Sequence, residues 1–80
     1  SMPIQNVRHT TEVALARQVA MYLSRELTGS SLKTIGLHFG GRDHSTVVHA
    51  CKVIEEKLEK DETLRSQVKS VRHKIEMSQL

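Results

Sequence analysis

The chain lacks the features that mark secreted, membrane-spanning or nucleotide-hydrolysing proteins. It has one cysteine among 80 residues, so it cannot form an internal disulfide. No hydrophobic run approaches the roughly 18 residues of a membrane span, and the first residues contain no apolar signal-peptide core. There is also no G-x-x-x-x-G-K-S/T phosphate-binding loop. These absences predict a soluble protein of a reducing compartment that hydrolyses no nucleotide.

Size and charge limit the function further. A chain of 80 residues buries only about 60–65% of its unfolded surface, which leaves little material for a deep cleft and excludes a large enzyme. Twelve Lys and Arg residues against nine Asp and Glu residues give a net charge of +3. This mild basic bias is compatible with nucleic acid but does not identify it as the partner.

The apolar residues recur at helical spacing, and no segment alternates with the period of a strand. We predict an all-α bundle of about four helices: residues 12–28, a two-turn helix from 30 or 31 to 39, residues 43–60, and a last helix that starts near 61. Thr10 or Thr11 is the predicted first N-cap, Gly29 is the first stop, and the hydroxyl of Ser30 or Ser31 is predicted to cap the second helix. Residues 12–80 then form one domain. Residues 1–11 are predicted to be irregular, with Ser1 and Met2 a cloning remnant on an excised piece of a longer protein.

Each predicted helix carries one apolar stripe, which we expect to face a common core. The stripes consist of Ala16, Val19, Ala20, Leu23 and Leu27; then Leu32, Ile35 and Phe39; then Val47, Cys51, Ile54 and Leu58; and finally Leu64, Val68, Val71 and Ile75.

The segment from residue 39 to residue 48 joins a glycine break to a helix start that is rich in hydrogen-bonding side chains. Two consecutive glycines can adopt positive φ values, which ends one helix and turns the chain into the next. Arg42, Asp43, His44, Ser45 and Thr46 then occupy the first turn, where a helix-turn-helix protein presents side chains to base edges. The segment predicts a recognition helix.

The outer face of this helix carries groups that can read bases. At 100° per residue, Ser45, His49 and Lys52 lie opposite the apolar stripe, and Ser45 and His49 are one turn apart. Carboxylate, hydroxyl and imidazole groups all match base edges in the major groove. Simpler interpretations stay open: Asp43 as an N-cap, His44 as a partly packed residue and Arg42 as a surface charge.

Basic residues elsewhere could bind phosphates around this helix. They are Arg25 on the first helix, Lys33 at the start of the second and Lys52 on the third. Lys33 lies at a helix N-terminus, where free N–H groups favour an anion. Arg17, further back on the first helix, belongs to the same group of basic residues, but a solvated surface charge is the simpler interpretation of its position.

Four other functions are less favoured by the pattern. Cys51 lies on an apolar stripe, which indicates a packed thiol and not a nucleophile. His44 and His49 are five residues apart, so with Asp43 they do not form the stacked pair of a zinc helix. A protein-interaction module could use the last helix, but its stripe is needed to close the core. A palindrome-reading dimeric repressor would need an exposed apolar face, and no stripe is left over for one.

Three motifs together resemble a known family. The runs ARQVAMYL at residues 16–23, SLKTIG at 31–36 and FGGRDHSTVVHA at 39–50 are similar to the C-terminal DNA-binding domain of DnaA, the bacterial initiator of chromosome replication. The resemblance covers the chain from about Val13 onward. Family members carry a further helix before the first motif, which links it to an ATPase module. Here that linker helix is expected to be truncated.

The resemblance implies a Trp-repressor-like helix-turn-helix that binds the DnaA box, a short asymmetric duplex sequence resembling TTATCCACA. By position, Arg17 would enter the adjacent A·T-rich minor groove. The implied major-groove readers are Asp43, His44, Ser45, Thr46 and His49, with Arg42 beside them. Ser45 stands where the family often has Thr, so one methyl contact with thymine is in doubt.

The resemblance also implies the oligomeric state of the domain, its location in the cell and its lack of catalytic activity. It is expected to be a monomeric, non-enzymatic domain of a cytoplasmic, nucleoid-associated protein, with no cofactor and no metal. ATP binding, and oligomerisation on the replication origin, would belong to other modules of the full-length protein.

Overall fold

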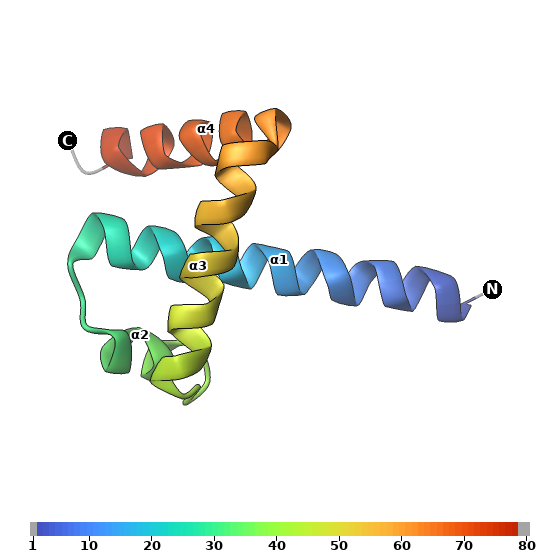
Figure 1. The fold of residues 1–80 in the computed structure, drawn as a ribbon, viewed down its shortest axis with the longest axis horizontal. Coiled ribbons are helices and arrows are strands. Elements are labelled where there is room, and N and C mark those ends of the chain that lie inside the picture. The colour runs from blue at the N-terminus through green and yellow to red at the C-terminus, as the bar shows by residue number, and fades with distance from the viewer. Residues whose placement is uncertain (1, 79–80) are drawn as a thin grey trace.

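A computed structural model describes the backbone of residues 2–78 and the side chains of residues 11–78. Four helices make up the described chain: α1 (Met2–Thr28), α2 (Leu32–His38), α3 (His44–Lys60) and α4 (Glu62–Ser78). Helix α3 crosses α1 steeply, α2 packs beside the start of α3, and α4 follows α3 and runs in the same direction as α1, alongside its C-terminal half (Figure 1). The predicted all-α bundle is confirmed.

The helix ends follow from local sequence. Gly29 adopts a φ of +67° and ends α1. The Thr34 N–H donates to the Ser31 hydroxyl at 3.1 Å, which caps α2, and the Leu64 N–H donates to Asp61 Oδ1 at 3.0 Å, which caps α4. The predicted stop at Gly29, the cap at Ser31 and the start of α4 near Asp61 are therefore confirmed.

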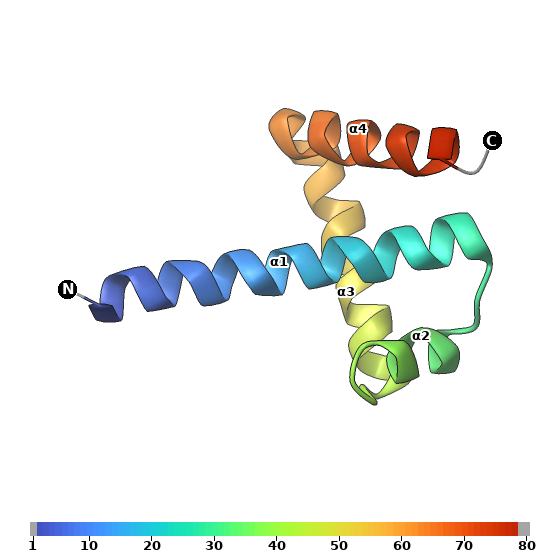
Figure 2. The same ribbon diagram turned by 180° about the vertical axis from the view of Figure 1, so that it is seen from behind.

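The start of the first helix was predicted wrongly. Helix α1 begins at Met2, so residues 2–11 are not irregular and neither Thr10 nor Thr11 is an N-cap. Pro3 lies in the first turn, where a missing N–H costs no intrahelical hydrogen bond. The N-terminal half of α1 extends away from the other helices, as the view from behind also shows (Figure 2). Ser1, part of the predicted cloning remnant, lies outside the described residues.

The core consists of two clusters on different faces of α1. Met21 packs with Ile35, Val47, Ala50 and Cys51, which joins α1 to α2 and α3. Leu23 packs with Leu64 and Val68, which joins α1 to α4. The single stripe predicted for the first helix describes only the second cluster, because it leaves out Met21, which is 1% exposed.

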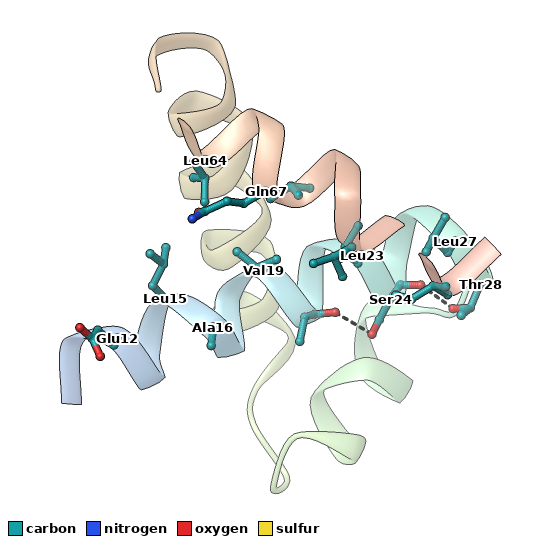
Figure 3. Close-up of a pocket in the computed structure, with 14 residues that line it drawn as sticks. Glu12, Leu15, Ala16, Val19, Leu23, Ser24, Leu27, Thr28, Leu64 and Gln67 are labelled. Atoms are coloured by element: carbon teal, nitrogen blue, oxygen red, sulfur yellow. Dashed lines mark hydrogen bonds between the residues drawn. The ribbon is translucent and has the colours of Figure 1, made fainter. Parts of the chain in front are cut away.

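Helix α4 closes the core only in part. Leu64 and Val68 are buried, whereas Val71 is 43% exposed. Between α1 and α4 the apolar side chains line an open groove, with Leu15, Val19, Leu23 and Leu27 on one side and Leu64, Val68, Val71 and Ile75 on the other (Figure 3). The expectation that no apolar face is left over is therefore wrong for this side of the bundle.

Cys51 is a core residue, as the sequence predicts. Its side chain is 0% exposed, and burial raises the pKa of the thiol. We expect the native domain to react with Ellman's reagent at least about tenfold more slowly than the chain unfolded in guanidinium, because the thiolate is the reactive form. The release of thionitrobenzoate measures both rates, and equal rates would contradict the burial of this thiol.

Candidate nucleic-acid interface

A short backbone turn fixes α3 against α2. Gly40 and Gly41 have φ values of +87° and +74°, as the predicted glycine turn requires. The Arg42 N–H donates to the Gly36 carbonyl at 2.8 Å, and a Cβ on Gly36 would overlap the Arg42 carbonyl oxygen. The first turn of α3 is thus held on a rigid support, which is what a recognition helix needs.

The first turn of α3 is fully available to a partner. Arg42 and Asp43, just before α3, and His44, Ser45 and Thr46, in its first turn, are all exposed, whereas the apolar stripe that starts at Val47 is completely buried at Val47, Cys51 and Ile54. The packed-residue interpretation of His44 is therefore wrong. Five exposed hydrogen-bonding side chains therefore gather at the start of α3, while the apolar face of the same helix is packed in the core.

Asp43 stands at the N-cap position of α3, but its carboxylate does not cap the helix. The Ser45 hydroxyl donates to Asp43 Oδ2. The other oxygen, Oδ1, lies 3.6 Å from Nδ1 of His44, which is an ion-pair distance only when the ring is protonated. The hydrogen bond from Ser45 lowers the pKa of Asp43 below its ordinary value, and His44 contributes to the same shift. Asp43 is therefore an exposed, ionised carboxylate.

A continuous outer strip extends from this first turn along α3. Ser45, Val48, His49 and Lys52 are related by three or four residues, so they are neighbours on one face, and all four are exposed. Val48 was not among the predicted site residues, although it is 39% exposed. The sequence could have indicated Val48, because it is an apolar residue that lies 100° around the helix from the core stripe.

The predicted basic residues lie at different places around α3. Lys33 is exposed in the first turn of α2, and Arg17 is half-buried on α1, one turn before Met21 and on the same face. The face of α1 that carries Arg17 therefore packs on α2 and α3.

Arg25, unlike Lys33, forms ion pairs with carboxylates of the domain itself. Its guanidinium lies 3.5 Å from a Glu55 carboxylate oxygen and 3.9 Å from one of Glu26. Glu55 is ten residues beyond Ser45, which is about 15 Å along the helix axis. The structure therefore does not bring Arg25 together with the exposed first turn, and its predicted phosphate contact competes with two carboxylates.

Comparison with known proteins identifies the fold. Residues 3–54 match the family model described as the bacterial DnaA protein helix-turn-helix. The chain belongs to this family. The match begins at residue 3, so the similarity extends further toward the N-terminus than Val13, over the part of α1 that was expected to be irregular.

Several chromosomal replication initiator proteins DnaA are similar to the chain. That of Chlorobaculum tepidum is 56% identical over 66 residues, which cover 82% of the chain and 13% of the relative. Those of Streptococcus equi subsp. zooepidemicus and Streptococcus pyogenes serotype M1 are 49% identical over 72 residues, 90% of the chain and 16% of each relative. The chain thus spans about one-sixth or less of the length of these DnaA proteins.

Membership in the DnaA family makes the chain a DnaA-type helix-turn-helix domain, a kind of domain that binds DNA. Among the side chains of residues 11–78, no group of three His, Cys, Asp or Glu residues is placed to hold a metal. None of the described helices is long and apolar enough to cross a membrane.

Proposed function

We propose that the domain binds the DnaA box in duplex DNA, with the first turn of α3 in the major groove and Arg17 in the adjacent minor groove. The observation that carries the proposal is the exposed first turn, where five hydrogen-bonding side chains project from a helix that is fixed by its apolar face. An α-helix fits the major groove, and the N-terminal residues of a recognition helix contact base edges there.

Each outer residue of α3 has a role in this proposal. The readers of hydrogen-bonding base edges are Asp43, His44, Ser45, Thr46 and His49, with Arg42 beside them. Val48 supplies an exposed apolar surface to a thymine methyl, which compensates for the methyl that Ser45 lacks relative to Thr. Lys52 is exposed one turn beyond Val48, which supports a contact with a phosphate in this proposal.

The domain acts as one part of a replication initiator in this proposal. It binds its asymmetric box as a monomer and needs neither a metal nor a cofactor to do so. ATP binding, and oligomerisation on the origin, belong to the rest of a protein of which this chain would be a small fraction, and that protein works on the nucleoid in the cytoplasm.

Arg17→Ala is expected to weaken binding mainly through the A·T-rich end of the box. A narrow A·T minor groove has an enhanced negative potential, which attracts a guanidinium. Fluorescence anisotropy should therefore show that substitutions at that end weaken the parent domain by about 1–3 kcal/mol but affect the variant little. If the end substitutions weaken both proteins equally, Arg17 is not a minor-groove residue.

Lys33→Ala is expected to weaken binding to a box duplex and to a scrambled duplex by the same factor. A lysine on a phosphate releases counterions without reading sequence, so the slope of log K against log salt concentration should fall by about 1. Titrations at two salt concentrations measure the slope. They also test the proposed function, since only the parent's preference for the box over the scrambled duplex supports base reading. An unchanged slope removes Lys33 from the phosphate contacts.

A further inference from the structure

The hydrogen bond between Ser45 and Asp43 determines which kind of base Ser45 can read. A serine hydroxyl has one hydrogen to donate and two lone pairs with which to accept. In the structure the single hydrogen is donated to Asp43 Oδ2, while the side chains of both residues stay exposed. The lone pairs of Ser45 Oγ are then all that it can offer to a ligand.

Asp43 cannot exchange roles with Ser45 at neutral pH. An ionised carboxylate only accepts hydrogen bonds, and the lowered pKa of Asp43 keeps it ionised. A charge-assisted hydrogen bond of this kind is stronger than one between neutral groups. The Ser45 hydroxyl is therefore held as a donor toward Asp43 in preference to turning outward.

We infer that Asp43 is a positioning residue that makes Ser45 a hydrogen-bond acceptor, so that the base facing Ser45 carries an exocyclic amino group. In the major groove these groups are N4 of cytosine and N6 of adenine, whereas O4 of thymine and O6 of guanine are acceptors and do not match. The inference rests on the proposed DNA binding and adds the class of base that one position must have.

A second acceptor lies next to the first. The Ser45 hydroxyl donates to Oδ2 of Asp43, and Oδ1 lies 3.6 Å from His44 Nδ1, too far for a hydrogen bond with that ring. The backbone N–H groups of Ser45 and His44 also interact with this exposed carboxylate. A carboxylate has about four lone-pair sites, so Asp43 can direct Ser45 and still accept a hydrogen bond from DNA. The exposed first turn presents two neighbouring acceptors, while Arg42 and His44 are its donors.

The test is a scan of the box with single base-pair changes that replace the amino group of one base by a carbonyl and place an amino group on its partner base instead. Uracil paired with adenine replaces cytosine paired with guanine, and hypoxanthine paired with cytosine replaces adenine paired with thymine. The parent domain and Ser45→Ala are titrated on each duplex, and the ratio of their preferences isolates the part that depends on Ser45. At one position we expect a Ser45-dependent preference of about five- to tenfold for the amino group.

Asp43→Ala tests the positioning role at that same position. Without the carboxylate, the Ser45 hydroxyl can turn and donate to a carbonyl, so the Ser45-dependent preference should fall below about twofold or reverse. Ser45→Thr keeps a hydroxyl for Asp43 and should retain the preference of the parent. Ser70→Ala, an exposed serine on α4, is the matched control and should behave like the parent.

The outcomes separate this inference from the proposed function. If the parent does not distinguish the box from a scrambled duplex, the proposed function fails. If it does, but no position shows a Ser45-dependent amino preference, or that preference persists in Asp43→Ala, the inference alone is overturned. Should Asp43→Ala fail to fold, Asp43→Gly provides the same readout, since glycine is tolerated at an N-cap.

Discussion

Gly36→Ala is expected to destabilise the domain by about 3 kcal/mol or more, a loss typical of severe overpacking. An added Cβ would overlap the Arg42 carbonyl oxygen and lie 3.2 Å from the carbonyl carbon, and both are backbone atoms. The turn cannot move aside freely, because the Arg42 N–H donates to the Gly36 carbonyl at 2.8 Å. The contact between α2 and α3 must open instead, which disturbs the cluster around Ile35 and Val47. Urea denaturation followed by circular dichroism measures the loss.

Gly29→Ala is the matched control for Gly36→Ala. Gly29 has a positive φ of 67°, but a Cβ there would meet no atom within 4 Å. Its replacement should cost only about 1–2 kcal/mol, the penalty of a left-handed conformation for a residue with a side chain. If both variants lose the same stability, the close approach of Gly36 to Arg42 does not limit the packing of the turn.

His49→Ala is expected to weaken binding to the box by about 1–3 kcal/mol and to relax discrimination at one base position. His49 lies on the outer strip of α3, one turn beyond Ser45, and its side chain is exposed, so the substitution leaves the core intact. Anisotropy titrations with the box and with single-position variants of it measure both effects.

His73→Ala is the control for His49→Ala. His73 is an exposed histidine on α4. Helix α4 lies at the opposite end of α3 from the exposed first turn (Figure 1). Its replacement should leave the preference for the box unchanged. An equal loss of affinity for box and scrambled duplexes in His49→Ala would show that His49 contacts the backbone and reads no base.

Short-range signals predicted most of the fold. The cap at Ser31 and the positive φ of Gly29 are determined by neighbours within a few residues, so the sequence was sufficient to find them. The N-terminal extension of α1 was missed because Pro3 was read as a sign of irregular chain. In the first turn of a helix proline is compatible with helical structure, and residues 2–11 do extend α1.

Long-range packing was harder to predict. Met21 and Leu23 are two residues apart, yet both are buried, because α2 and α3 cover one face of α1 and α4 covers another. A search for one stripe per helix finds only one of these faces. The pairing of Arg25 with Glu55 joins residues 30 apart, and it was equally invisible before the two helices were placed.

The glycine turn and the start of α3 were predicted correctly, but the contacts among the side chains there could not be derived. Asp43 has two short-range partners within reach, the backbone N–H groups that an N-cap residue accepts from and the Ser45 hydroxyl. Sequence alone does not decide between them, and in the structure the hydroxyl is the partner. Which residues touch DNA stays a prediction, since exposure shows only that Arg42 to Thr46 and His49 are available.

Methylation interference with dimethyl sulfate tests the two-groove account most directly, because one reagent marks both grooves. It methylates guanine N7 in the major groove and adenine N3 in the minor groove. We predict that N7 methylation inhibits binding in the part of the box under α3, and that N3 methylation inhibits it in the adjacent A·T-rich part. Arg17→Ala should abolish only the adenine signal. Interference at neither kind of site, or an adenine signal that Arg17→Ala leaves intact, would contradict the account.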